Sequence, residues 1–325
     1  MAKTGFNLES INRSLVPAEY SLLRIDRYLA GRFSYLSRTG WQNEIRNGKV
    51  YHNGLQLFNY HKKVKAGDEV QYISEERYEP QVNRNYSILY EDEYLMVINK
   101  PPDLPVHPAG IYYRNTLLSI LTTDLGMGLH PVHRLDRETS GAVIMSKCTK
   151  TASFIQSNFH MVKKTYHAIV HGIMEADGFD IIMPIGNDAG SAIRKKRAAY
   201  PEAGETAETS FRRLHSIDGY TLVEALPVTG RQHQIRVHLK YAGFPILGDK
   251  LYGLDENYFL EFIEKGNDPD LIRRIGFGRC ALHSRSVHFY HPGLKEEIHV
   301  EAPLPEDMRN FMNEKMPSPP TPLPE

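Results

Sequence analysis

The most informative segment of this chain reads His133-Arg134-Leu135-Asp136-Arg137-Glu138-Thr139-Ser140-Gly141. It lies between a stretch rich in Gly and Leu and an apolar run that begins at Ala142, so we expect a loop that leads into a strand. Asp136 is flanked by two arginines, and nearby positive charge favours the ionised form of a carboxylate. By composition alone, a structural ion pair explains such an arrangement more often than a reactive site does. The interpretation therefore depends on the longer string and on what accompanies it.

Several separate blocks of the chain, in the right order, resemble the RluA-type pseudouridine synthases. The segment around Asp136 matches the HRLDxxTSG signature of that family at every defined position. The other matching blocks are Asn99-Lys100-Pro101-Pro102 with Val106-His107-Pro108, Lys164-Thr165-Tyr166 with Ala168, Gly230 to Leu239, Gly248 to Gly253, and Ala281-Leu282-His283. The resemblance covers residues 88–305. It implies an RNA-modifying enzyme that isomerises uridine without a cofactor.

The resemblance also implies roles for individual residues. Asp136 matches the catalytic carboxylate of the family, Tyr166 the ring that stacks on the target base, and Arg236 the arginine that pairs with the carboxylate. We expect RNA contacts from other positions in these blocks, namely Arg134, His133, Thr139, Arg231, His233 and Gln234. Outside such blocks, a lone strand Tyr would be assigned to the core and a lone Arg to the surface.

Between residues 88 and 305 the pattern predicts many short strands and few helices. Strand-like apolar runs occur at 95–99, 142–145, 166–170 and 222–225, and helical stretches at 150–159 and 232–241. Strands and helices do not alternate regularly, so we expect an α+β fold with a mixed or antiparallel sheet.

The first part of the chain has a different character. Helical spacing over 22–33, a second helical stretch over 37–47 and an Asn53-Gly54 turn predict a small unit of helices and a hairpin. These features resemble the S4 RNA-binding domain, a small module of the αL type. Positions 22–66 hold nine Lys or Arg against two Asp or Glu, a net charge of 9 − 2 = +7.

The basic side chains of this first unit are candidates for RNA contact. Arg38, Gln42 and Arg46 recur every four residues, which places them on one face of the second helix. We expect phosphate contacts from Arg38, Arg46 and Lys49. A solvated helix face is the alternative explanation for the same pattern.

These observations divide the chain into five parts. They are an N-terminal extension at 1–21, an S4-like RNA-binding domain at 22–74, a linker at 75–87, the catalytic domain at 88–312 and a disordered Pro-rich tail at 313–325. The polar composition and the proline of the linker, and the repeated prolines of the tail, are typical of such segments.

Composition limits the remaining possibilities. The 39 Lys plus Arg balance 39 Asp plus Glu, which argues against a protein that coats nucleic acid wholesale but allows a local basic face. Cys148 and Cys280 lack zinc or disulfide spacing, and no glycine-rich nucleotide loop is present. We therefore expect no metal, no cofactor and a cytoplasmic protein. No apolar run has the length of a membrane span, and a monomer is the default for the family.

Three features depart from the family pattern, of which Thr165-Tyr166-His167 only fills variable positions in a non-standard way. Asp103 stands where many relatives have Gly, and residues 254–277 resemble an insertion that can alter which RNA fits. Residues 194–197 form a basic run in an expected loop, which phosphate contact and simple solvation explain equally well.

The sequence thus predicts isomerisation of uridine in RNA, with large-subunit ribosomal RNA favoured and transfer RNA as an alternative. Asp136 can act as a nucleophile or as a general base, and both remain open. A non-catalytic RNA-binding or ribosome-assembly factor is a rival, although Asp136, Tyr166 and Arg236 are all retained. A glycosidase is a second rival, but it would need a pair of carboxylates, with Glu138 as the nearest partner.

Overall fold

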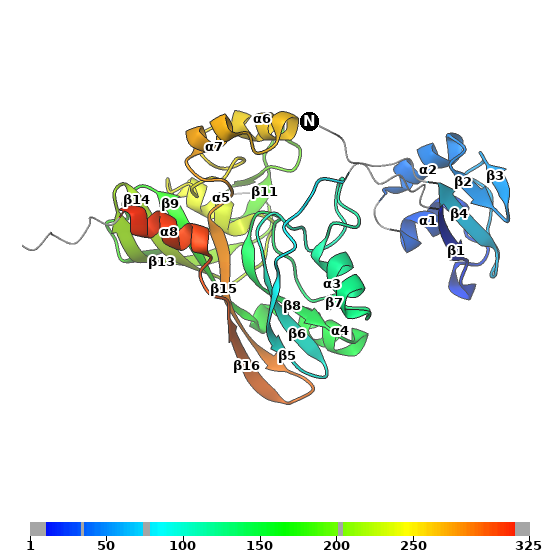
Figure 1. The fold of residues 1–325 in the computed structure, drawn as a ribbon, viewed down its shortest axis with the longest axis horizontal. Coiled ribbons are helices and arrows are strands. Elements are labelled where there is room, and N and C mark those ends of the chain that lie inside the picture. Colours follow the sequence, from blue (N-terminus) through cyan, green and yellow to red (C-terminus); the bar gives the residue numbers. More distant parts are fainter. Residues whose placement is uncertain (1–10, 34–35, 74–78, 201–203, 316–325) are drawn as a thin grey trace, which may run out of the picture. The chain divides into compact units, whose positions relative to one another are not determined.

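The computed structural model describes residues 11–33, 36–73, 79–200 and 204–315 (Figure 1). Within these ranges the chain forms two compact units. The first is drawn from residues 1–81 and 108–115, and the second from residues 82–107 and 116–325.

The first unit is a small antiparallel sheet with two helices (Figure 1). Its strand order is β1-β4-β2-β3, and the strands are β1 Ile11–Leu15, β2 Val50–His52, β3 Leu55–Leu57 and β4 Glu69–Ile73. Helix α1 spans Ile25–Arg32 and helix α2 spans Arg38–Arg46, after a 3-10 turn at Ala18–Tyr20. Aromatic and aliphatic side chains, with Trp41 fully buried, fill the space between sheet and helices. The two expected helices and the hairpin are confirmed.

Local sequence explains where these elements begin and turn. The Ser37 hydroxyl accepts a hydrogen bond from the amide of Gly40 at 3.1 Å, which caps helix α2. Asn53 and Gly54 have φ values of 50° and 79°, as a tight hairpin turn requires. Strand β1 pairs with β4, so the boundary expected at residue 22 lies too late. The segment assigned to an extension supplies an edge strand instead.

A buried carboxylate holds part of the basic face of this unit. Asp26 is fully buried and accepts hydrogen bonds from Arg24 at 2.9 Å, Arg38 at 2.9 Å and Gln42 at 2.7 Å. Burial raises the pKa of Asp26, but these donors lower it by more, so the carboxylate stays ionised. Arg38 therefore has a structural partner inside the unit, which its spacing on the helix did not reveal.

The second unit is built on a mixed sheet of ten strands (Figure 1). The order is β10-β13-β14-β9-β15-β8-β6-β5, with β16 beside β15 and β7 beside β8. The pair β15–β8 is parallel and the other pairs are antiparallel. The strands are β5 Ser87–Glu91, β6 Leu95–Lys100, β7 His130–Pro131, β8 Ser140–Ser146, β9 Lys163–His171, β10 Gly178–Ile182, β13 Glu208–Ile217, β14 Tyr220–Pro227, β15 Leu282–His291 and β16 Glu296–Glu301. The expected α+β fold is confirmed.

Helices and a small ribbon surround this sheet. The helices are α3 Leu117–Leu125, α4 Thr149–Ser157, α5 Gln234–Tyr241, α6 Asn257–Lys265, α7 Pro269–Ile275 and α8 Glu306–Lys315, with a 3-10 turn at Phe159–Met161, and the ribbon joins β11 Ile185–Asn187 to β12 Arg197–Ala199. Side chains of β9, β14 and β15 pack with α5 and α8 in one apolar core. Among the helices in the described ranges, none combines the length and the apolar character that a bilayer crossing demands.

The parallel pairing of β8 with β15 fixes the loop that precedes β8. Ser140 pairs with His283, and Gly141 pairs with Ser284. Gly141 has a φ of 108°, and a Cβ added there would lie 2.2 Å from the Ser284 carbonyl oxygen. Glycine is needed at this close approach, and it anchors the end of the loop that carries Asp136.

Two expected domain boundaries differ from the ends of the elements in the structure. Helix α8 runs to Lys315, so the first residues of the expected tail at 313–325 are helical, and residues 316–325 lie outside the described ranges. Of the expected linker at 75–87, residues 75–78 lie outside the described ranges, and Ser87 already belongs to β5.

Candidate active site

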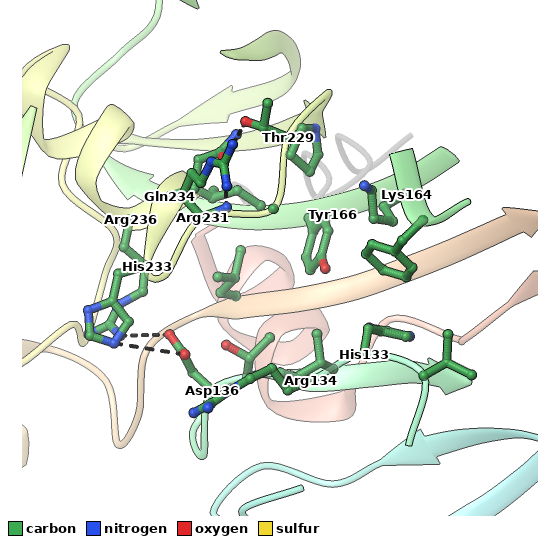
Figure 2. Close-up of a pocket in the computed structure, with 18 of the residues that line it drawn as sticks. His133, Arg134, Asp136, Lys164, Tyr166, Thr229, Arg231, His233, Gln234 and Arg236 are labelled. Carbon is green, nitrogen blue, oxygen red and sulfur yellow. Dashed lines mark hydrogen bonds and ion pairs between the residues drawn. The ribbon is translucent and has the colours of Figure 1, made fainter. Parts of the chain in front are cut away.

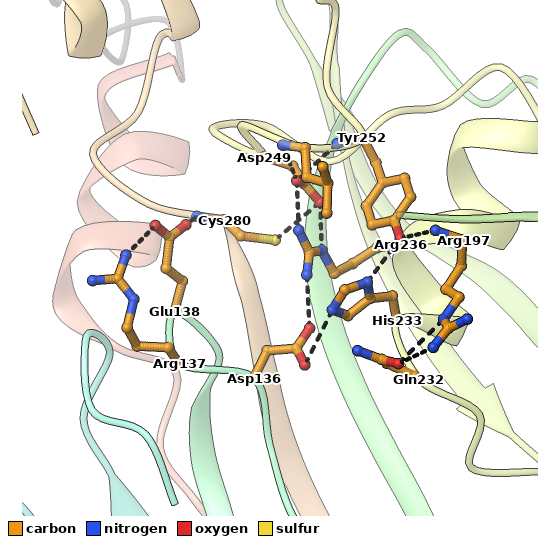
Figure 3. Close-up of polar contacts among 11 residues, drawn as sticks. Asp136, Arg137, Glu138, Arg197, Gln232, His233, Arg236, Asp249, Tyr252 and Cys280 are labelled. Atoms are coloured by element: carbon orange, nitrogen blue, oxygen red, sulfur yellow. Dashed lines mark hydrogen bonds and ion pairs between the residues drawn. The ribbon is translucent and has the colours of Figure 1, made fainter. Parts of the chain in front are cut away.

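A loop and a helix from distant parts of the chain meet at Asp136 (Figures 2 and 3). Arg236, on α5, donates a hydrogen bond from Nη1 to Asp136 Oδ2 at 2.8 Å. His233, in a left-handed conformation before α5, places Nε2 3.9 Å from Asp136 Oδ1. The Asp136 side chain remains 27% exposed, so a substrate can reach the carboxylate.

A second carboxylate holds the other edge of the Arg236 guanidinium (Figure 3). Asp249 accepts from Nε at 2.7 Å and from Nη2 at 2.8 Å, and two backbone amides hold Asp249 in turn. The centroid of the Tyr252 ring lies 4.9 Å from the guanidinium carbon, and the Tyr252 hydroxyl lies 2.7 Å from His233 Nδ1. The bidentate pair fixes the plane of Arg236 and leaves Nη1 for Asp136.

The charges of this cluster favour an ionised Asp136. Burial raises the pKa of Asp136, but protonated His233, the charge of Arg236 and the Arg236 hydrogen bond lower it by more. Burial also raises the pKa of Asp249, but the charge and the hydrogen bonds of Arg236 lower that pKa to about 2. Burial lowers the pKa of His233 to about 4, so the imidazole is neutral near pH 7. Arg236 is then the cation that keeps both carboxylates ionised.

Asp136 opens onto a pocket of about 370 Å³ (Figure 2). Tyr166, on β9, lies on another wall, and burial raises the pKa of its hydroxyl to about 12. The phenol therefore stays protonated at neutral pH and offers a ring and a hydroxyl rather than a base. Asp136 is the acidic residue among the described residues that line the pocket.

A buried lysine, Lys100, holds the loop that carries Asp136. Lys100 is fully buried, and its Nζ donates to the carbonyl oxygens of Pro101 at 2.8 Å, Leu104 at 2.8 Å and Arg137 at 3.1 Å. Burial lowers the pKa of Lys100 to about 7. The bond to the Arg137 carbonyl ties the residue after Asp136 to the end of β6.

The Glu138 carboxylate also holds this loop in place (Figure 3). Its carboxylate accepts from Arg137 at 3.0 Å, from Lys250 Nζ at 2.9 Å and from the amide of Cys280 at 2.9 Å. It does not line the pocket. Glu138 therefore supports the loop and does not pair with Asp136 as a glycosidase would require.

Three of the expected RNA contacts are engaged inside the protein. His133 Nε2 accepts from the Ile144 amide at 3.0 Å, and burial lowers the pKa of His133 to about 3. Thr139 is 3% exposed and Gln234 is 4% exposed. The side-chain carbonyl oxygen of Gln234 accepts hydrogen bonds from the Arg231 backbone amide and from the Thr229 hydroxyl. All three line the pocket, and these contacts shape its wall.

The other expected contacts reach solvent. Arg134 is exposed at the pocket, with Nη1 3.3 Å from His107 Nε2. Arg231 also lines the pocket and pairs with Glu205 at 2.7 Å. These two guanidinium groups are therefore accessible to a ligand at the pocket mouth.

The expected contact residues of the first unit are not among the residues that line this pocket. Arg46 donates to the Tyr60 hydroxyl at 3.1 Å, and Lys49 Nζ lies 3.6 Å from Glu44. Neither these residues nor Arg38 line the pocket.

The expected insertion at 254–277 forms α6 and α7, and its side chains pack beside the loop that carries Asp136. The Phe262 ring centroid lies 5.0 Å from the Arg137 guanidinium carbon and 5.0 Å from Lys250 Nζ. Phe259 lies under Lys195 at 4.3 Å. The insertion thus connects the basic run at 194–197 with the residues that follow Asp136 and Asp249.

The sequence pattern predicted no role for Asp249 or Lys100, and Glu138 was considered only as the second carboxylate of a glycosidase. Each lies in one of the sequence blocks that resemble the family, but its role depends on the atoms that it contacts in the folded protein. A buried acid or lysine inside such a block is the signal that would have drawn attention to them, because buried charges need partners.

Comparison with known proteins agrees with this fold and pocket. Residues 94–241 match the family of RNA pseudouridylate synthases. The chain is 35% identical over 303 residues to an uncharacterized RNA pseudouridine synthase of Bacillus subtilis, YlyB, covering 89% of this chain and 93% of that protein. The chain belongs to the RNA pseudouridine synthase family and is therefore an isomerase.

Further relatives extend the comparison. The chain is 33% identical to the ribosomal large subunit pseudouridine synthase D of Vibrio parahaemolyticus, covering 88% of each protein. The solved structure of human RNA pseudouridylate synthase domain containing 4 aligns with a TM-score of 0.53 and 29% identity, over 71% of this chain and 94% of that one.

Proposed function

We propose that this chain isomerises uridine in large-subunit ribosomal RNA to pseudouridine, with Asp136 as the catalytic carboxylate. The observation that carries the proposal is the Arg236–Asp136 contact of 2.8 Å at a pocket also lined by Tyr166. The choice of RNA is supported by relatives named as ribosomal large subunit synthases.

The reaction breaks the C1′–N1 bond, turns the base and joins C5 to C1′. The proton on C5 is lost to solvent and N1 gains one, so the product is an isomer of uridine. An ionised Asp136 can attack as a nucleophile or remove a proton next to C1′. Both routes need an oriented anion, and Arg236 supplies the hydrogen bond and the charge that favour it. Oδ1 is the oxygen that Arg236 does not bond, so we assign the chemistry to Oδ1.

The target base must leave the RNA stack to reach this pocket. The Tyr166 ring offers a stacking surface, which offsets part of the unstacking cost. Arg134, at the exposed side of the pocket, holds the flipped nucleotide or fills the space that it leaves. The first unit, with its excess of basic residues at 22–66, serves as an S4-like RNA-binding domain.

Tritium release tests this function directly. Large-subunit ribosomal RNA and transfer RNA, each transcribed with uridine tritiated at C5, are incubated separately with wild-type protein. We expect release from the ribosomal transcript, because the label leaves when C5 becomes bonded to C1′. Release from transfer RNA alone would overturn the choice of substrate. No release from either RNA would favour the non-catalytic RNA-binding factor.

A further inference from the structure

Lys164 is a buried cation on a wall of the pocket. It is 6% exposed and lines the pocket from β9. Its Nζ lies 4.8 Å from the centroid of the Phe159 ring. No carboxylate within the described ranges comes within ion-pair distance of it, and no hydrogen bond satisfies its ammonium there.

The other cations at the pocket either have partners or, like Arg134, are exposed to solvent. Arg236 bonds to Asp136 and to Asp249, and Arg231 pairs with Glu205. His233 is neutral near pH 7 because burial lowers its pKa to about 4. Lys164 therefore differs from them, because it is a buried cation that contacts the Phe159 ring but has no carboxylate partner among the described residues.

A buried charge of this kind lowers the stability of the folded protein unless a ligand supplies its counter-ion. A buried ammonium without a counter-ion destabilises the folded protein, and burial accordingly lowers the pKa of Lys164. A neutral group on a base could accept a hydrogen bond but could not balance the charge. The phosphate groups of RNA are its anions, so a phosphate is the group that fits.

The position of Lys164 indicates which phosphate of the RNA it would bind. Lys164 and Tyr166 are two residues apart on β9, so their side chains share a face and stand about 6–7 Å apart along the strand. Figure 2 shows both side chains at the same pocket. This spacing suits one nucleotide, with its base at Tyr166 and its phosphate at Lys164.

We propose that Lys164 binds the phosphate of the uridine nucleotide whose base enters the pocket. The inference rests on the proposed function, since it takes RNA as the substrate. Lys164 is thus a binding residue that positions the nucleotide, and Asp136 remains the reacting group.

The test compares wild type with Lys164→Met, Lys164→Gln and Lys164→Arg. Lys163→Met is the matched control, because Lys163 is the exposed neighbour on the same strand. The measurement is kcat and KM for tritium release from the large-subunit ribosomal transcript over a series of salt concentrations. Thermal unfolding without RNA is recorded for each protein.

We expect Lys164→Met and Lys164→Gln to lower kcat/KM about 10- to 100-fold, chiefly through KM, because a charge-assisted hydrogen bond is lost. The plot of log kcat/KM against log salt should flatten by about 0.7, the value for one phosphate of a single strand. Lys164→Arg should keep most of the slope, and Lys163→Met should match wild type. Without RNA, Lys164→Met should unfold at the same temperature as wild type or higher.

Other outcomes would overturn the inference. A fall in kcat/KM with an unchanged salt slope would indicate contact with a neutral group. A lower unfolding temperature in both neutral variants, with the wild-type slope, would indicate a structural role. If the wild-type protein releases no tritium, the proposed function is contradicted, and the inference about Lys164 falls with it. If wild type is active and the Lys164 variants equal Lys163→Met, this inference alone fails.

Discussion

Arg236 Nη1 lies 2.8 Å from Asp136 Oδ2, although one hundred residues separate them along the chain. The same guanidinium makes a bidentate pair with Asp249, which is 2% exposed. One buried cation therefore serves two carboxylates, of which only Asp136 lines the pocket. The orientation of Asp136 depends on this arrangement.

The variant Asp136→Asn keeps the size of the side chain and removes its charge. We expect folded protein whose turnover is lower by about 10²- to 10⁴-fold, because the anion acts in either chemical route. Tritium release measures the loss, and Asp180→Asn, at an exposed position on β10, is the control. Turnover above half that of wild type would remove Asp136 from the mechanism.

The variant Arg236→Lys keeps a positive charge but cannot bond both carboxylates in a fixed plane. We expect kcat to fall about 10- to 100-fold, while KM changes little, because Asp136 loses its orientation. Steady-state kinetics separates the two constants, and Arg273→Lys, on the exposed face of α7, is the control. A raised KM with unchanged kcat would assign Arg236 to substrate binding instead.

The contribution of Asp249 to stability should depend on pH in acid. Its folded pKa of about 2 lies below the ordinary 3.8, so ionised Asp249 stabilises the protein above about pH 4 and loses this effect towards pH 2. The shift corresponds to about 2 kcal/mol. We expect Asp249→Asn to cost about 3–5 kcal/mol near pH 7, because Arg236 loses a buried partner.

Denaturant unfolding of wild type and Asp249→Asn at several pH values tests this dependence. The gap between their free energies of unfolding should narrow as the pH falls from about 4 to about 2. A gap that stays constant over that interval would contradict the assigned pKa. Asp180→Asn controls for general effects of acid.

Tyr166 should act through its ring. We expect Tyr166→Phe to keep the wild-type KM and Tyr166→Ala to raise it about 10- to 100-fold, because stacking contributes about 1–3 kcal/mol per base. Since the pKa of the hydroxyl is raised to about 12, no titration of Tyr166 should appear in the pH–rate profile between pH 6 and about 10. Equal KM values for the Phe and Ala variants would contradict a stacking role.

Much of this architecture was visible in local patterns. The short apolar runs predicted the strands of an α+β sheet, and the Asn53-Gly54 turn predicted the hairpin that the structure contains. Strand β1 was missed, because a five-residue edge strand has too little periodic pattern to stand out. The Asp26 network was missed for a related reason, since helix spacing shows that Arg38 and Gln42 share a face but not what that face meets.

The family, the fold class and the candidates Asp136, Tyr166 and Arg236 follow from residue order alone, because short motifs and local periodicity are written along the chain. The pair of Arg236 with Asp136 was implied by the family resemblance, but the other partners of these residues were not. Three features depend on elements that are distant in sequence. They are the contacts of Arg236 with Asp136 and Asp249, the hydrogen bond from Lys100 at the end of β6 to the Arg137 carbonyl, and the lack of a counter-ion near Lys164 among the described residues. Hydrogen bonds and charge compensation depend on distances across the fold, so only the three-dimensional arrangement could reveal them.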